Sequence, residues 1–337
     1  MPAATPDVVQ QIAPRLPRGV TLREWRPEDL PRVVVFQNRY SRPAQRQTLQ
    51  DMERWESMAD PNEVRARLVV EAGDELIGVA GAGDGGRWRP PDGSWGAWLR
   101  IDDAWKRKGI GTAIADALED YARGHGAPSL TAGLRGDERD GIAFAEKRGY
   151  REFHRRQTAY LDLTAFDASR FEDPDAIARR GGFRLASYAE LAAAGEAEGL
   201  RRRVHELHSA TWREVPTPEI PPPPSYEDLS RYAFDSPTFE PRATTLALRG
   251  DELVGLTLAD VNGSGVGYTF MTGVLSSARG NDLALAMKLR AIAVLKERGV
   301  RLFGTTNDKD NAPMLAVNRK LGYEPEPPSI RMKKPLS

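Results

Sequence analysis

The chain has 337 residues, of which 40% are hydrophobic and 28% are charged. Its 48 basic residues balance its 48 acidic residues, so we do not expect a general binder of nucleic acid or anionic membranes, which needs a basic excess. The chain contains no cysteine, which excludes disulfides, thiolate metal sites and a cysteine nucleophile. Four histidines are too few for a histidine-rich centre, so we expect no metal.

Residues 1–18 are interpreted as a short N-terminal arm, disordered or loosely docked, because they lack the apolar core of a secretory signal. No run of about 18 apolar residues occurs, so a membrane-spanning helix is not expected. We therefore expect a cytoplasmic protein that works without a membrane.

Residues 19–163 are predicted to form one domain in which strands and helices alternate. The predicted order is a strand over 20–25, helical sequence, a hairpin around Gly73-Asp74, a strand over 97–101, a long helix from 110, a strand over 130–134, a short helix that ends at Gly149 and a last strand. Apolar runs on both sides of Gly73-Asp74 indicate the hairpin. Ile110, Ile114 and Leu118 share one face of the long helix.

The polar residues 164–181 are interpreted as a linker, and residues 182–337 repeat the same order of elements. GDELIGVA at 73–80 returns as GDELVGLT at 250–257, and EKRGY at 146–150 returns as RKLGY at 319–323. The EKRGY pair and a third pair, residues 105–118 with residues 278–291, share one offset of 173, which indicates one fold used twice. Antiparallel hairpins mixed with helical crossovers predict an α+β class, with a mixed, mostly antiparallel sheet flanked by helices in each half.

The clearest chemistry lies in the segment WKRKGIGT, residues 105–112. A basic triplet precedes Gly109 and Gly111 at the start of a predicted helix. Glycines let backbone N–H groups approach a ligand closely, and a helix N-terminus favours an anion such as pyrophosphate. A plain turn is the alternative, but the adjoining strand, the basic residues and the duplicated context favour a phosphate site.

This segment resembles the pyrophosphate loop of the GNAT superfamily of N-acetyltransferases, whose pattern is Gln/Arg-x-x-Gly-x-Gly/Ala. Residues 106–111 fit the pattern with lysine in the first position, and the two-half layout is similar to tandem members of the family. Residues 279–284 agree at their first and last positions, but Asp282 replaces the middle glycine. A carboxylate is electrostatically unfavourable at a phosphate cradle, so we expect the second half to bind the cofactor more weakly.

The resemblance covers residues 19–334 and implies acetyl-CoA as the donor and a small-molecule primary amine as the acceptor. We expect a monomer or a weak homodimer. The implied cofactor contacts lie at the strand end and loop of each half and before the last helix of the second half: Ile101, Lys106, Arg107, Lys108, Gly109, Ile110, Gly111, Thr112, Val274, Arg279, Gly280, Asn281, Leu283, Ala284 and Asn311. Glu138 stands at the position of Asn311 in the first half.

The resemblance also implies a tyrosine that protonates the departing thiolate, four residues before a Gly-aromatic pair. Ala145 and Asn318 occupy those positions, so both halves lack it and the catalytic residues stay unassigned. Tyr268 and Asp260 are the remaining candidates for a hydrogen-bond donor and a base. Their alternatives are a half-buried strand tyrosine and a solvated turn residue.

Three further features have open interpretations. His205 and His208 share a helix face and are interpreted as helix surface or cleft lining. The tryptophans at 88, 95, 98 and 105 pack in the core or line a site for an apolar acceptor. The insertion at 215–229, which contains Pro221–Pro224, forms a wall of the acceptor cleft, a strap between the halves or a surface spacer.

Two functions follow from these patterns. The first is an acetyl-CoA-dependent N-acetyltransferase that acts on a small-molecule amine. The second is a catalytically degenerate acyl-CoA-binding or sensor protein, which the missing tyrosines favour.

Overall fold

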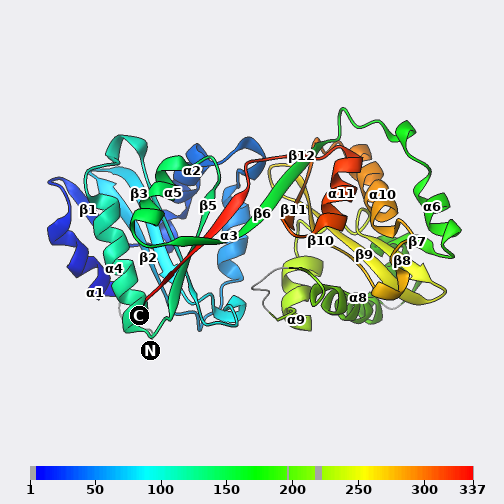
Figure 1. Cartoon of the computed structure of the whole chain (residues 1–337), viewed down its shortest axis with the longest axis horizontal. Coiled ribbons are helices and arrows are strands. Elements are labelled where there is room, and N and C mark those ends of the chain that lie inside the picture. Colours follow the sequence, from blue (N-terminus) through cyan, green and yellow to red (C-terminus); the bar gives the residue numbers. More distant parts are fainter. Residues whose placement is uncertain (1–4, 196, 217–221, 337) are drawn as a thin grey trace. The chain divides into compact units, whose positions relative to one another are not determined.

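The computed structural model describes residues 5–195, 197–216 and 222–336. By its contacts the chain divides into two compact units (Figure 1). The first comprises the residues up to Arg155 together with those from Ser329 onward, and the second comprises Arg156–Pro328. In the described part of the chain, no helix is long and apolar enough to cross a membrane.

The first unit is built around a mixed sheet with strand order β1-β2-β3-β4-β5-β13. Its elements are α1 (Thr5–Ile12), β1 (Val20–Glu24), α2 (Leu30–Tyr40), α3 (Leu49–Ser57), β2 (Arg65–Ala72), β3 (Glu75–Gly83), β4 (Trp95–Ile101), α4 (Ile110–Gly124), β5 (Ser129–Arg135), α5 (Arg139–Lys147), the start of β6 (Arg151–Asp162) and β13 (Ser329–Pro335). β4 and β5 are parallel, whereas the other neighbours in this sheet are antiparallel.

The second unit repeats this arrangement with strand order β7-β8-β9-β10-β11-β6, and β12 lies beside β6. Its elements are the rest of β6, α6 (Pro174–Arg180), β7 (Arg184–Ser187), α7 (Tyr188–Ala194), α8 (Ala197–Trp212), α9 (Tyr226–Leu229), β8 (Thr245–Arg249), β9 (Glu252–Val261), β10 (Gly267–Val274), α10 (Leu283–Glu297), β11 (Leu302–Asp308), α11 (Ala312–Leu321) and β12 (Glu324–Pro325). β10 and β11 are again the parallel pair. The predicted α+β class and the duplicated fold are confirmed.

The closing strand of each sheet comes from the other half of the sequence. β13, at the end of the chain, pairs with β5 from Ser329 opposite Arg135 to Pro335 opposite Ser129. The second part of β6 pairs with β11 in the second unit, from Arg156 opposite Asp308 to Asp162 opposite Leu302. The units therefore differ from the expected domains 19–163 and 182–337, because an apolar strand pattern does not encode which neighbour the strand pairs with.

The expected N-terminal arm and linker are both partly helical. Val8 and Ile12 lie one turn apart on α1 and are buried in the core of the first unit. In the expected linker, Ile177 and Ala178 of α6 are buried in the core of the second unit. The expectation of a loosely docked arm is wrong, because its apolar side chains share one face of a helix.

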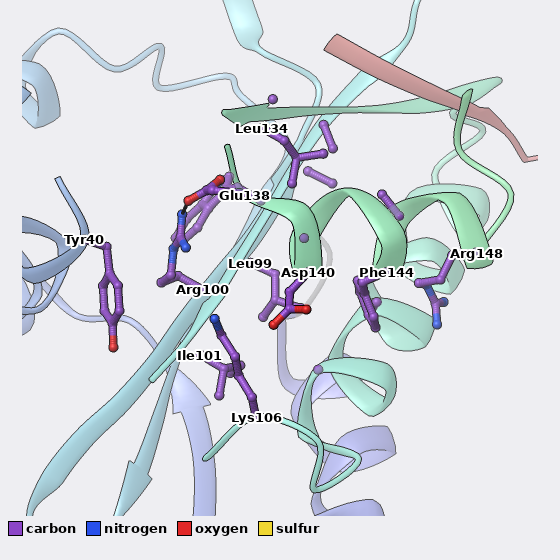
Figure 2. Close-up of a pocket in the computed structure, with 18 of the residues that line it drawn as sticks. Tyr40, Leu99, Arg100, Ile101, Lys106, Leu134, Glu138, Asp140, Phe144 and Arg148 are labelled. Atoms are coloured by element: carbon purple, nitrogen blue, oxygen red, sulfur yellow. Dashed lines mark hydrogen bonds and ion pairs between the residues drawn. The ribbon is translucent and has the colours of Figure 1, made fainter. Parts of the chain in front are cut away.

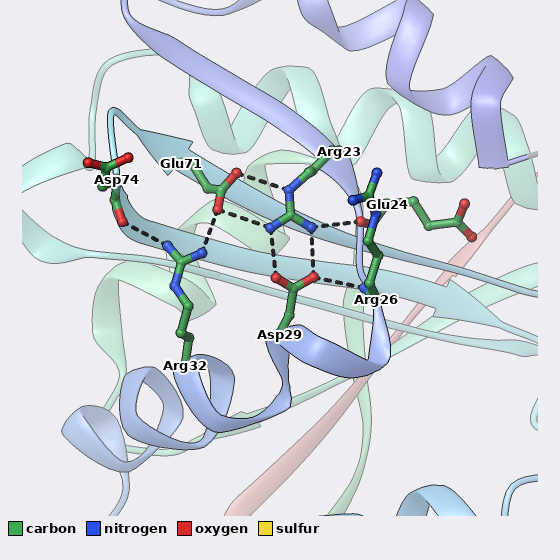
Figure 3. Close-up of polar contacts among 7 residues, drawn as sticks. All are labelled: Arg23, Glu24, Arg26, Asp29, Arg32, Glu71 and Asp74. Atoms are coloured by element: carbon green, nitrogen blue, oxygen red, sulfur yellow. Dashed lines mark hydrogen bonds and ion pairs between the residues drawn. The ribbon is translucent and has the colours of Figure 1, made fainter.

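A polar cluster joins β1, β2 and the start of α2 in the first unit (Figure 3). The Arg23 guanidinium donates to both oxygens of Asp29 at 2.7 Å and to both oxygens of Glu71 at 3.1 Å. Asp29 also accepts the backbone N–H of Arg26, and its residue surface is only 6% exposed. The hydrogen bonds from Arg23 hold the pKa of Asp29 below its usual value.

Candidate functional site

The parallel strands β4 and β5 pair only at their beginnings. Their register runs from Trp95 opposite Leu130 to Ala97 opposite Ala132. β4 then continues to Ile101 along β3 on its other side. From residue 98 onward, the described strands leave the β5-facing edge of β4 without a strand partner, so its backbone groups can bind a ligand.

A cavity of about 870 Å³ lies at this opening and is lined from both faces of the sheet. α4 and α5 contribute Ala115 and Phe144 on one face, and α2 contributes Gln37 and Tyr40 on the other. Figure 2 shows Tyr40 on one side of the strand and Phe144 on the other. A ligand at the opening can therefore be approached from either face.

The glycine-rich loop borders this cavity. Gly109 has φ +83°, directly precedes α4, and has open space where a Cβ would lie. The first N–H groups of α4 have no partner within the helix and carry its positive dipole end. Lys106 pairs with Asp103 at 2.5 Å and Arg107 with Asp140 at 2.9 Å. Because these pairs are exposed, an anion can take over the two cations at small cost.

Most of the predicted first-half cofactor residues line the cavity: Ile101, Lys106, Arg107, Gly109, Gly111 and Thr112. Lys108 and Ile110 are not among its lining residues. The Lys108 ammonium lies 4.3 Å from the centre of the Trp105 ring, and the Ile110 side chain is buried in the core.

The second-half loop has left-handed residues at the same two positions, with glycine and non-glycine exchanged. In the first half Arg107 has φ +62° before Gly109, whereas in the second Gly280 has φ +80° before Asp282 at +54°. Asp282 therefore adopts the conformation of the glycine that it replaces. Arg279 donates its Nε–H to the backbone oxygen of Val274 at 3.2 Å and pairs with Glu214.

The second pair of strands opens at the same place. β10 and β11 pair from Gly267 opposite Phe303 to Thr269 opposite Thr305, and β10 continues along β9 to Val274. A register shift leaves Phe270 as an extra residue of β10, whereas the β3–β4 register is continuous. Such a bulge redirects backbone groups at the opening.

The residues before α5 and α11 differ in their contacts. The Asn311 side chain accepts the Met314 N–H at 3.3 Å and caps α11. The Glu138 carboxylate accepts hydrogen bonds from the Arg100 guanidinium of β4 at 2.5 Å and from the backbone N–H of Arg135 at 3.2 Å. An ion pair thus lies in the first-half cavity, which both of its side chains line (Figure 2).

A model of the acetyltransferase (GNAT) family matches residues 21–150 and again residues 181–323. The chain belongs to the GNAT family of acetyltransferases. The two matched segments are the two predicted repeats, so the tandem arrangement is confirmed. No curated protein matches the sequence.

Solved structures share the fold over almost the whole chain. The chain is similar to a GCN5-related N-acetyltransferase from Sphaerobacter thermophilus, with a TM-score of 0.71 and 19% identity over 95% of this chain and 97% of that one. It is also similar to a tandem GNAT protein from the clavulanic acid biosynthesis pathway, with a TM-score of 0.73 and 21% identity over 94% and 99%. These identities show the fold alone.

The two catalytic candidates lie opposite each other on neighbouring strands of the GNAT sheet. Asp260 is a buried residue of β9, so the alternative of a solvated turn residue is wrong. It faces Tyr268 of β10 in the strand register. The Tyr268 hydroxyl hydrogen-bonds with Thr306, and burial raises its pKa, which keeps the phenol neutral. Tyr268 lies in the paired part of β10, before the strands separate.

The histidines, the tryptophans and the proline-rich insertion singled out in the sequence differ in their burial and contacts. His208 is buried and stacks on Trp212, so it is not helix surface, and burial lowers its pKa to about 4. Trp95 is buried in the core, whereas Trp98 is 39% exposed and lines the cavity. In the insertion, the Pro224 carbonyl lies 2.9 Å from His205 Nε2, whereas Pro221 lies outside the described residues.

Tyr40 and Arg100 also line the cavity, although the sequence did not predict them there. The Arg100 guanidinium stacks 5.2 Å from the centre of the Tyr40 ring, and the Tyr40 hydroxyl donates to Asp102 at 2.9 Å. Alternation along β4 places Trp98 and Arg100 on one face and could have indicated Arg100. Tyr40 lies far away in the sequence, and no local pattern predicts its position.

Proposed function

We propose that the chain is an N-acetyltransferase that transfers an acetyl group from acetyl-CoA to a primary amine of a small molecule, with acetyl-CoA held by the first half. Family membership supports the acetyltransferase class. The observation that carries the proposal is the cavity at the β4–β5 opening, because it joins the glycine-rich loop to the face covered by α2. Two substrates can meet there from opposite faces of the sheet.

The donor side fits acetyl-CoA. The N–H groups at the start of α4 would bind the pyrophosphate, and Lys106 and Arg107 would add charge after leaving their exposed carboxylate partners. No Cβ stands at Gly109 to hinder this approach. The unpaired edge of β4 would hydrogen-bond the pantetheine arm and orient the thioester carbonyl.

The acceptor side is formed by Tyr40, Trp98 and Arg100. The half-exposed indole of Trp98, which packs edge-on against Trp25, favours an acceptor with an apolar or aromatic part. Burial and the nearby Asp102 raise the pKa of Tyr40 to about 12, so its hydroxyl orients an acceptor and does not act as a base. Glu138 lines the cavity, is held by Arg100 of β4, and can accept the proton of the amine through water.

The alternative is an acyl-CoA-binding or sensor protein. The Arg100–Glu138 ion pair favours it, because the pair engages the carboxylate proposed above as a base. Ala145, which also lines the cavity, provides no hydroxyl to protonate a thiolate. This function would require tight cofactor binding without turnover.

Calorimetric titration with acetyl-CoA and CoA, combined with a thiol-release assay over an amine library, tests both functions. The enzyme should release CoA with at least one amine, and Trp98→Ala should raise the KM for that amine while the Kd for acetyl-CoA stays unchanged. Exposed Trp88→Ala is the matched control and should change neither. Binding without turnover across aminoglycosides, polyamines, amino acids and peptides would establish the sensor instead.

A further inference from the structure

The second unit contains a buried lysine that the proposed function leaves unexplained. Lys288 of α10 is 0% exposed, and its Nζ donates to Asn318 Oδ1 of α11 at 2.9 Å. Asn318 Nδ2 in turn donates to Asn307 Oδ1 of β11 at 2.6 Å. Lys288, Asn318 and Asn307 thus form a hydrogen-bonded chain that links two helices to a strand.

The charge of Lys288 has no ionic partner among the described residues. Its Nζ lies 4.7 Å from the centre of the Tyr323 ring, and burial keeps that phenol neutral by raising its pKa. Burial alone lowers the pKa of Lys288 to about 7. An unpaired buried ammonium is costly, so its presence needs a reason other than stability.

The first half shows that the fold does not require this chain. Lys288 in the second half and Ala115 in the first both lie six residues after the second left-handed position of their loop. Asn318 in the second half and Ala145 in the first lie four residues before the Gly-Tyr pair. Asn307 of β11 and Leu134 of β5 lie two residues beyond the last pair that each strand forms with its parallel neighbour. Ala115, Ala145 and Leu134 all line the first-half cavity. The polar chain of the second half therefore stands at the equivalent wall, where β10 and β11 separate.

The amide of Asn318 is poised to donate a further hydrogen bond. Its oxygen is occupied by Lys288, which fixes the orientation of the amide. One N–H of Nδ2 is directed to Asn307, and the other has no partner among the described residues. An ammonium bound to the amide oxygen polarises the amide and strengthens its N–H as a donor.

Transfer of an acetyl group from a thioester places negative charge on sulfur. The amine nitrogen forms a bond to the carbonyl carbon, and the carbon–sulfur bond breaks with its electron pair left on the sulfur. The proton of the amine passes to water, and the product leaves as CoA thiolate. A donor and a nearby cation stabilise that charge most strongly in a water-poor site.

We propose that Asn318 donates a hydrogen bond to the sulfur of CoA in the second half, and that Lys288 is the positioning residue that orients and polarises it. The proposal rests on the proposed function, since it takes acetyl-CoA as the donor substrate, and it extends that function to the second half. Asn307 completes the arrangement by fixing the other side of the amide.

The test compares CoA with desulfo-CoA, which lacks only the sulfur, by titration calorimetry of the full chain. An Ala115→Trp background fills the first-half cavity so that the second half is measured alone, and a two-site fit without that substitution provides an independent measurement. Asn318→Ala and Lys288→Ala introduce the residues that the first half carries at these positions. The equivalent change in the first half, Ala145→Ser, is the matched control.

CoA should bind the second half about tenfold more tightly than desulfo-CoA, and both variants should bring the ratio close to one. Asn318→Ser, which keeps a donor, should restore part of the preference, and Ala145→Ser should leave the second-half ratio unchanged. Equal losses for both ligands would show a merely structural role and overturn the proposal. Binding confined to the first half would overturn it while leaving the proposed function intact, whereas no binding by either half would reject the proposed function itself.

Discussion

The two phosphate loops of this chain reach one backbone conformation with different residues. Arg107 and Gly109 occupy the left-handed positions of the first loop, and Gly280 and Asp282 occupy those of the second. Loop shape therefore does not distinguish the halves, and the difference between them lies in charge and in the walls of the clefts. The first half has alanines where the second half has Lys288 and Asn318.

The opposite faces of the two sheets also differ. Arg100 of β4 extends toward Tyr40, whereas the equivalent residue of β10 is Gly273, where a Cβ would lie 2.6 Å from Thr211 of α8. α8 thus packs directly on the second sheet at the place where the first has a polar cavity. Duplication preserved the strand opening and diversified what surrounds it, so we expect the halves to have different ligand preferences.

The largest expected effect tests whether the two halves of the sequence fold independently, and it follows from the exchange of β6 and β13. Residues 1–163 expressed alone lack β13, whose neighbourhood buries Ile330, Met332 and Leu336 in the first core. Losing these three side chains removes about 5 kcal/mol of stability or more. We expect no cooperative thermal unfolding, and recovery when residues 329–336 are fused through a flexible linker. A fragment that unfolds cooperatively near the Tm of the full chain would contradict the exchange.

The substitution Lys288→Met tests whether the buried lysine of the second half lowers the stability of the chain. Burial lowers the pKa of Lys288, so between about pH 7 and 10.5 the folded chain binds fewer protons than the unfolded chain. The buried ammonium therefore lowers the free energy of unfolding most at about pH 7 and below, and this loss of stability fades as the pH rises towards 10.5. The variant should be about 2–4 kcal/mol more stable at pH 7, with little gain at pH 10. Urea unfolding at both pH values measures this, with Ala115→Met as control. A gain independent of pH would contradict the account.

Exchanging glycine and aspartate between the two phosphate loops tests how strongly the loop charge controls CoA binding. Gly109→Asp should weaken CoA binding to the first half about tenfold or more, because it adds a carboxylate at the helix N-terminus. Asp282→Gly should strengthen binding to the second half. Titration calorimetry measures both, and circular dichroism verifies that each variant is folded. Unchanged affinity in folded Gly109→Asp would count against the first loop as the phosphate site.

The smallest expected effect concerns the ion pairs that support each sheet. Asp29→Asn should cost about 1 kcal/mol at pH 7, and the cost should disappear as acid protonates the wild-type carboxylate below about pH 4. The direction follows from the lowered pKa of Asp29, whose stabilisation is present above its unfolded pKa and lost as the pH falls. Glu190→Gln, at a more exposed pair with Arg290, should cost only a few tenths. Equal costs for the two variants would be inconsistent with this difference in burial.

The repeat, the hairpins and the glycine-rich loop could be predicted from the sequence because each has a local pattern. Gly73 and Gly250 both have φ +58° at the predicted hairpin turns, and Gly322 has φ +88° after α11. The exchange of β6 and β13 could not be predicted, since a strand has the same alternation with either partner.

The cavity residues show the same limit. Lys106 and Gly109 carry a motif, whereas Tyr40 reaches the cavity only through the packing of α2 on the sheet. Lys288 appears in the sequence as one of four charged residues of α10, and only the structure shows that it is buried against Asn318.

A crystal structure of the full chain with acetyl-CoA tests the central claim most directly. We expect the pyrophosphate over the first turn of α4, beside Gly109, with the pantetheine arm along β4 beyond Ala97, where the pairing with β5 ends. Acetyl-CoA bound only over the loop before α10, with the first-half cavity empty, would contradict it.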